Sequence, residues 1–331
     1  MQHHIRNTLA AAVAALTLTQ PALAAEKIAL VVKSLGNGFF DAARQGAQEA
    51  AKELGGLEIV YAGPAKPTAE GQVEIVNALI AQRVKAIAIS ANDPDALVPV
   101  LKKAQQRGIK VLSFDSMVRK DGRQLHLAPS STPLIGAKLA ALVLDAAPAG
   151  GEVAVLSATA QATNQNAWIA AMKTTLASPP YAKVKLVSVV YGDDQTDKSY
   201  REAQGLLKSH PNLKVIVAPT TVGIAAAARA VQDERMTGQV FVTGLGLPSE
   251  MQGHVKGGAV KSFAIWNPVD LGYSVVHAAN VLVKGSVKGV PGETVPLGRV
   301  GKMALDANAE GAMAEPFTFN AGNVDKFAKM Y

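Results

Sequence analysis

The first charged side chain that could contact a ligand is Lys33, which directly follows the apolar run of residues 28–32. Such a run of mostly branched residues is typical of a strand buried on both faces of a parallel sheet, and such sheets bind ligands where their strands end. Two aromatic residues, Phe39 and Phe40, come after a glycine-rich turn. An ammonium group donates hydrogen bonds to hydroxyls and aromatic rings cover C–H faces, so this stretch suits a sugar. The alternative is a solvated loop lysine with both rings in the core.

Polar side chains recur at the ends of the later predicted strands. They are Asn92, Asp93, Asp115, Asn164, Gln165, Asn166, Asp193, Asp194, Thr220, Thr221, Asn267 and Asp270. The only tryptophans, Trp168 and Trp266, lie in the same neighbourhoods. If the strand ends of two facing sheets meet, these groups line one cleft suited to a neutral polyhydroxyl ligand. Each has a structural alternative as well, since Asp93 and Asn164 could cap helices and Asp115 could belong to a turn.

Sequence signatures of catalysis are missing. The chain has no G-x-x-x-x-G-K-[ST] or G-x-S-x-G motif, and Gly244-Leu245-Gly246 lacks the third glycine of a dinucleotide-binding turn. Four later histidines show no metal-ligand spacing: His126, His210, His254 and His277. Asp193 and Asp194 could form an acid–base pair, although adjacent loop carboxylates are usually solvated. We therefore expect a protein that is not an enzyme, with no catalytic residue, metal site or cofactor.

The elements that must position these residues alternate along the chain. Strands are expected at 28–32, 57–61, 84–90 and 109–114 with helices between them, and the same order returns from residue 152. This alternation predicts an α/β fold of two similar doubly wound parallel-sheet lobes. Further strands in the tail cannot all extend the second lobe in sequence. Some connections should therefore cross back, forming a multi-strand hinge.

The amino terminus has a separate pattern. Arg6 precedes an apolar run at 9–18, and Ala22-Leu23-Ala24 fits the cleavage site of a secretory signal peptide. The chain has no cysteine, which excludes a lipid anchor at that site as well as disulfides. We expect export to a periplasm with residues 1–24 removed, and no attachment as a lipoprotein.

Composition limits the partners. The 331 residues are 49 % hydrophobic and 18 % charged, which suffices for large cores and two domains. The formal charge is +7, and it falls to +6 without residues 1–24, which hold one base (Arg6) and no acid. The bases are spread along the sequence without a cluster or interleaved aromatics. We therefore expect a solvated basic surface and no nucleic-acid partner.

Several segments resemble type I periplasmic sugar-binding proteins of ABC importers, the ribose-binding-protein-like family. The resemblance covers residues 27–331 and is strongest to the rhamnose-binding subgroup in KSLGNGFFDA, GPAKPTAEGQ, ISANDPDAL, FDS, TNQNAW, APTTVGIAAA, TGLGLPSEM and WNPVDLGY. Proteins that bind the signal autoinducer 2 form a sister group. That group has Asp at the positions of Asn164 and Asn267, and this chain departs from it at both.

The resemblance implies a receptor that closes on a monosaccharide between two lobes and delivers it to a membrane permease. L-Rhamnose is the expected ligand, and autoinducer 2 or a pentose-type sugar is the alternative. A periplasmic enzyme or a ligand-sensing regulator core on the same fold would be different classes of function. The implied ligand contacts are Lys33, Phe39, Phe40, Asp115, Asn164, Gln165, Trp168, Pro219, Thr220, Thr221, Trp266 and Asn267.

The lobes should exchange segments of chain. The first lobe is expected to comprise residues 25–128 with 268–297, and the second 129–267 with 298–331. We expect this two-lobed protein to be a monomer.

Overall fold

The first strand and helix build the turn that carries Lys33. The computed structural model describes residues 25–331, so the signal peptide expected at 1–24 lies outside the described residues. Strand β1 (Glu26–Val31) is buried from Ile28 onward. Helix α1 (Gly38–Leu54) begins where the Asn37 side chain accepts a hydrogen bond from the Phe39 amide, the usual role of an N-cap asparagine.

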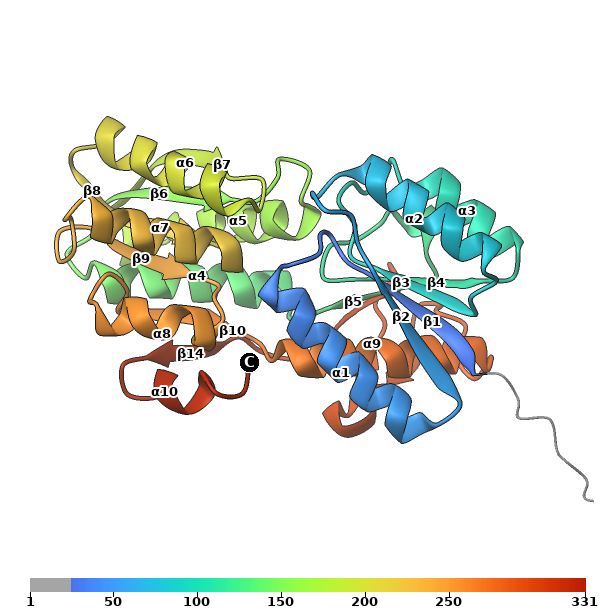
Figure 1. Ribbon diagram of the computed structural model, residues 1–331. Helices are drawn as coiled ribbons and strands as arrows, with labels where there is room; N and C mark the ends of the chain where they lie inside the picture. The colour runs from blue at the N-terminus through green and yellow to red at the C-terminus, as the bar shows by residue number, and fades with distance from the viewer. Residues whose placement is uncertain (1–24) are drawn as a thin grey trace, which may run out of the picture.

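Six strands form the first sheet, and helices bury both of its faces. The strand order is β13 (Glu310–Ala312), β5 (Leu125–Ala128), β4 (Lys110–Phe114), β3 (Ala86–Ile89), β1 and β2 (Leu57–Ala62), with every pair parallel. Helices α1 and α9 (Pro268–Val283) cover one face, and α2 (Ala69–Ala81) and α3 (Val98–Gln106) cover the other (Figure 1). Because successive residues of a strand point to opposite faces, the continuous apolar run of β1 supplies both layers.

The second sheet repeats this architecture. Its parallel strands run in the order β7 (Val184–Tyr191), β6 (Gly151–Ser157), β8 (Leu213–Ala218) and β9 (Phe241–Gly244). A bridge from Leu245 to Ala264 adds β10 (Ser262–Ile265), and β14 (Phe317–Asn320) pairs antiparallel with β10.

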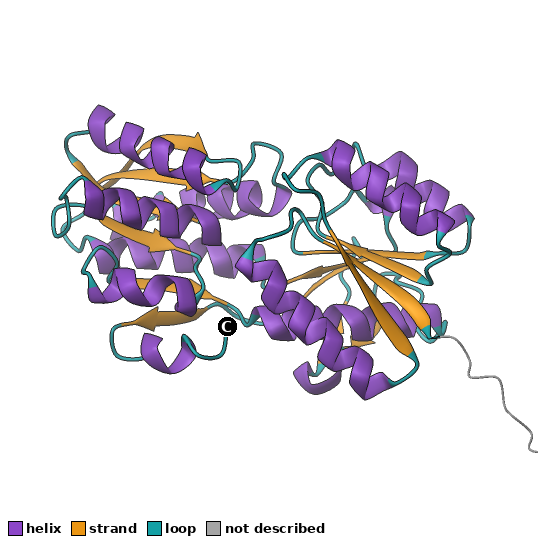
Figure 2. Ribbon diagram, in the orientation of Figure 1, coloured by secondary structure: helices purple, strands orange, loops and turns teal. Residues whose placement is uncertain are grey.

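Helices cover the second sheet on both sides as well. They are α6 (Thr196–Ser209), α7 (Thr221–Asp233) and α8 (Pro248–Lys256) on one side, and α4 (Thr132–Ala146) and α5 (Thr163–Leu176) on the other (Figure 2). The predicted fold of two parallel-sheet α/β lobes is thereby confirmed.

In the part of the chain that the structure describes, three segments cross between the sheets, after β5, β10 and β13. The first and third run side by side, since the Met313 and Ala314 amides donate to the Ala128 and Pro129 carbonyls at 3.0 and 3.1 Å. Residues 298–312 depart from the predicted division, which places them in the second lobe. The reason is that β12 (Lys302–Ala304) packs on β13, and β13 extends the first sheet beside β5. The other lobe boundaries stay predictions.

Helices α1 and α9 touch backbone to backbone. A Cβ atom at Gly46 would lie 1.7 Å from the Val269 carbonyl oxygen, and one at Gly272 would lie 1.7 Å from that of Ala43. No side chain fits into this space, so the approach requires glycine on both helices. Since α9 starts directly after the crossing that follows β10, the contact fixes this crossing beside α1, whose first turn holds Phe39 and Phe40.

The remaining described elements are short. They are β11 (Thr294–Pro296), α10 (Val324–Phe327) and the 3-10 turns Lys120–Gly122, Pro179–Tyr181 and Gly298–Val300. Within residues 25–331, no helix is long and apolar enough to cross a bilayer. In the same range, no group of three or more histidine, aspartate or glutamate side chains is arranged to hold a metal ion.

Candidate functional site

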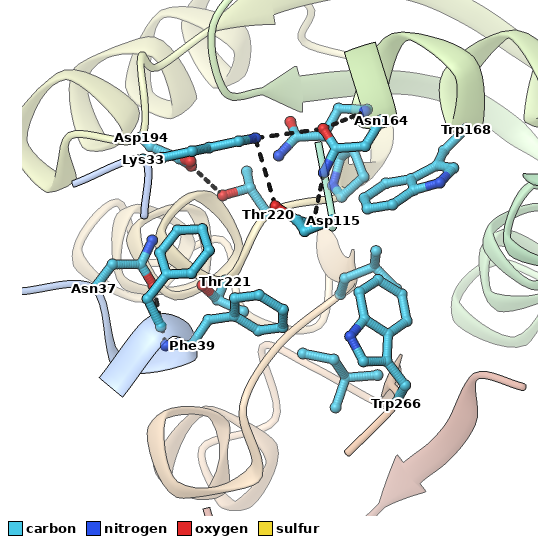
Figure 3. Close-up of a pocket in the computed structure, with 15 residues that line it drawn as sticks. Lys33, Asn37, Phe39, Asp115, Asn164, Trp168, Asp194, Thr220, Thr221 and Trp266 are labelled. Atoms are coloured by element: carbon cyan, nitrogen blue, oxygen red, sulfur yellow. Dashed lines mark hydrogen bonds and ion pairs between the residues drawn. The ribbon is translucent and has the colours of Figure 1, made fainter. Parts of the chain in front are cut away.

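A cleft lies between the carboxyl ends of the strands of the two sheets (Figure 3). It holds about 380 Å³ of empty space, part of which opens to solvent. Its walls contain every expected ligand contact except Asn267, together with Asn37, Asp194, Leu245 and Ile265. Parallel strands end at one edge of a sheet, and this is why residues distant in sequence meet here.

A buried cation lies at the centre of the polar wall. The Lys33 side chain is only 6 % exposed, and its Nζ lies 3.9 Å from Asp115 Oδ2 and 3.4 Å from Asn164 Oδ1. The second Asp115 oxygen accepts a hydrogen bond from Asn164 Nδ2 at 2.8 Å. Ser90 Oγ donates to Asp115 Oδ2 at 2.7 Å. The carboxylate therefore offsets the charge of a lysine that would be costly to bury alone.

Asn164 joins the two lobes. It lies in α5 of the second lobe, whereas Lys33 and Asp115 follow strands of the first sheet. Beside it, Ser116 Oγ donates to Asn164 Oδ1 at 3.1 Å, and the Met117 amide donates to Thr163 Oγ1 at 3.1 Å. These bonds cross the cleft, so the lobes are closed on one another in this structure.

Gln165 presents a donor to the cleft. Its Oε1 accepts hydrogen bonds from Ser157 Oγ at 2.9 Å and from the Ala158 amide at 2.7 Å. These two bonds orient the amide so that its oxygen faces the protein. Its Nε2 has no hydrogen-bond partner among residues 25–331, so it stays free to donate to a ligand oxygen.

Asp194 adds a second carboxylate to the polar wall. Its Oδ1 accepts a hydrogen bond from Thr220 Oγ1, and the residue lines the cleft with Lys33 and Asp115. Burial raises the pKa of the Asp194 carboxyl, the nearby Lys33 ammonium lowers it, and Asp115 raises it further. Asp194 belongs to the strand-end polar residues but not to the contacts that the family resemblance implies.

The opposite wall is aromatic and buried. The Phe39 and Phe40 ring centroids lie 5.2 Å apart, Phe39 lies 6.2 Å from Trp266, and Trp266 lies 5.5 Å from Trp168, all in edge-to-face geometry. Such arrangements are favoured between aromatic rings. The buried Trp266 Nε1 has no hydrogen-bond partner among residues 25–331. One wall of the cleft is thus polar and the other is mainly aromatic, with Asn37, Thr221 and the Trp266 N–H group as its polar parts.

Asn267 has a structural role in this arrangement. Its Oδ1 accepts from the Val269 amide at 3.0 Å and caps α9, and its Nδ2 donates to Asp270 at 2.8 Å. It is not among the residues that line the cleft. Asp93 also acts as a local cap, since its Oδ1 accepts from the Asp95 and Ala96 amides at 2.8 Å. An asparagine or aspartate before a helix can serve either role, and its type alone does not distinguish them.

Comparisons with known proteins agree with this geometry. The periplasmic binding protein domain profile matches residues 28–286. A solved ABC transporter solute-binding protein from Clostridium phytofermentas, with bound L-rhamnose, is 38 % identical with a TM-score of 0.89 and covers 93 % of this chain and 99 % of its own. The D-allose-binding periplasmic protein of Escherichia coli is 28 % identical over 78 % of this chain and 84 % of its own length.

A third comparison supports the fold alone. LsrB from Clostridium saccharobutylicum in complex with AI-2 is 21 % identical with a TM-score of 0.85, covering 91 % of this chain and 99 % of its own. Since the family profile spans residues 28–286, which is more than half of the chain, the chain belongs to the periplasmic binding protein family.

Proposed function

We propose that this protein is a periplasmic receptor that closes on a monosaccharide, L-rhamnose, and delivers it to the permease of an ABC importer. The observation that carries the proposal is the two-sided cleft, in which charged and amide groups face an aromatic wall. A sugar with hydroxyls on most of its ring and a methyl group at one edge matches both walls.

The polar wall suits a neutral ligand with many hydroxyls. Lys33 and the Gln165 amide nitrogen donate, whereas the Asp115 and Asp194 carboxylates accept. Lys33 supplies one positive charge against these two acids, so an anionic sugar would meet no excess of positive charge. A hydroxyl held by a charged group is worth about 1.5–3 kcal/mol, enough to reject a sugar that leaves one such group unpaired.

The aromatic wall suits a deoxyhexose. Phe39, Phe40, Trp168 and Trp266 offer apolar surface for the methyl group at C6, whose burial is worth about 0.8 kcal/mol. This alone is only about a fourfold preference, so the hydroxyl contacts must supply most of the selectivity. The 38 % identical protein with bound L-rhamnose supports the same ligand.

The same proposal covers the setting of the protein. It acts without catalysis, as a monomer in the periplasm after removal of residues 1–24, and it carries no cofactor. The two cited relatives are named as a solute-binding protein and a D-allose-binding periplasmic protein, which supports a receptor rather than an enzyme.

Titration calorimetry tests the ligand. The dissociation constant of L-rhamnose should be about tenfold lower, or lower still, than those of ribose, D-allose and autoinducer 2. The sugar should be recovered unchanged. Tighter binding of autoinducer 2 would overturn the assignment to rhamnose. Turnover of any of these compounds would overturn the receptor itself.

A further inference from the structure

A groove at the far end of the first sheet gathers positive charge. It lies where α2 and α3 end and where β3 and β4 begin, at the edge of the sheet opposite the sugar cleft. It holds about 1250 Å³ of empty space, part of which opens to solvent. Among residues 25–331, no acidic side chain lines it, and four basic ones do, namely Arg83, Lys85, Lys103 and Arg107. We call this site the basic groove.

The two arginines of the basic groove have free head groups. Neither guanidinium forms an ion pair or a hydrogen bond with any side chain of residues 25–331. The lysines are only weakly engaged. Lys103 Nζ donates to the neutral Asn77 Oδ1 at 3.0 Å, and Lys85 Nζ lies 3.8 Å from Glu26 in a pair whose side chains are 54 % and 43 % exposed. Exposed pairs of this kind offset little charge.

The ends of the helices can explain each arginine separately, but they do not explain why the cations lie together. Arg83 and Arg107 follow the last residues of α2 and α3, where positive charge stabilises a helix. This stabilisation of each helix does not require both helix ends to line the same groove. It also does not account for Lys85, which lies at the start of a strand. The convergence of four like charges on one concave surface is therefore unexplained by the helices alone. It produces a field that concentrates anions.

We propose that the basic groove binds phosphate-bearing anions. An arginine head group pairs with a phosphate through two parallel hydrogen bonds, and two unpaired guanidinium groups can hold one multiply charged anion between them. The phosphate can belong to a soluble compound or to a lipid headgroup. This site is separate from the sugar cleft and does not depend on the function proposed for it.

The test compares a variant that lacks both unpaired arginines with a control variant that loses the same charge at a distant site. Arg83 has a φ of 55°, so asparagine is the suitable replacement, and the groove variant is Arg83→Asn with Arg107→Gln. The control is Arg235→Asn with Lys208→Gln, on the second lobe. Arg235 has a φ of 57° and also follows a helix, so the control repeats both the backbone geometry and the charge change.

Two arms identify the source of the phosphate. Inorganic pyrophosphate is titrated into the protein at low salt, and phosphatidylcholine vesicles with and without phosphatidylglycerol are used in flotation. Binding in at least one arm should weaken by about tenfold in the groove variant, and it should stay within about twofold in the control. If the groove variant loses affinity for pyrophosphate, the ligand is a soluble compound. If it loses affinity only for the vesicles, the ligand is a lipid headgroup.

Other results would overturn the proposal. They are absence of binding in both arms, or equal weakening in the groove variant and the control, which would indicate net charge only. If the groove variant misfolds, Lys85→Gln with Lys103→Gln replaces it, since both side chains are exposed. Thermal melts that match that of the unmodified protein verify that each variant is folded.

Discussion

Replacing Asp115 by asparagine tests the polar wall most directly. Asp115 has a φ of 56°, in the left-handed region, where asparagine is tolerated but alanine adds strain. Asp115→Asn keeps the shape of the side chain and removes the charge that lies 3.9 Å from Lys33 Nζ. It also replaces one acceptor oxygen of the carboxylate by an NH2 donor. Depending on how the amide is turned, this donor faces Ser90 Oγ, Asn164 Nδ2 or the ligand.

The magnitude follows from the number of contacts affected. At least one charge-assisted hydrogen bond to a ligand hydroxyl is lost, worth about 1.5–3 kcal/mol. The dissociation constant for L-rhamnose should therefore rise by about 10- to 150-fold. The empty variant should also be less stable, because Lys33 is left buried without its counter-charge, so the dissociation constant is measured on protein that thermal melts show to be folded.

The matched control is Asp93→Asn. It removes one carboxylate from the same lobe, and asparagine can still accept from the Asp95 and Ala96 amides. Asp93 does not line the cleft, so its variant should bind sugar as the unmodified protein does. Titration calorimetry compares the two variants, with thermal melts of the empty proteins alongside. A loss below about threefold for Asp115→Asn, or an equal loss for both variants, would refute the role given to this carboxylate.

Four further predictions concern other parts of the molecule. Gly46→Ala should destabilise the protein by about 2 kcal/mol or more in urea unfolding, because its Cβ would meet the Val269 carbonyl, whereas Gly205→Ala in open space should not. Burial, followed by the charge of Arg123, lowers the pKa of His126 to about 3. The unfolded chain therefore binds one more proton, and stability should fall by up to about 1.4 kcal/mol per pH unit from about pH 6.5 toward 3. The His126→Gln variant should lack this slope. Trp266→Phe removes the unpaired N–H and should weaken sugar binding about three- to tenfold. Finally, saturating L-rhamnose should reduce the radius of gyration in solution scattering to the value expected for the closed structure described above, and an unchanged radius would contradict closure on the ligand.

The layered fold was predictable because its signals are local. A buried parallel strand is apolar on both faces, and each helix between strands carries an apolar stripe, so the order of elements is visible in the sequence. The position of β13 was not predictable in this way. It is three residues long, and its place beside β5 depends on backbone pairing between segments far apart in the chain.

The site was predictable as a region and less so residue by residue. Strand ends identify the edge of a sheet, and this brought Lys33, Asp115 and Asn164 together as expected, although their contact with a ligand stays a prediction. Asn267 shows the limit, since its side chain caps α9 and the sequence does not reveal this role, while its contact with a ligand stays a prediction. The basic groove shows a second limit. Bases that appear spread along the sequence converge because two helices end beside each other.

The contact between Trp168 and Trp266 has a practical consequence. They are the only two tryptophans of the protein, and both line the cleft with ring centroids 5.5 Å apart. Tryptophan fluorescence therefore arises entirely at this wall, with no background from the rest of the molecule. The electronic transitions of two indoles this close also couple, which should give a paired signal in near-ultraviolet circular dichroism. The unmodified protein thus carries its own optical reporter, and binding can be followed by stopped-flow methods without any label.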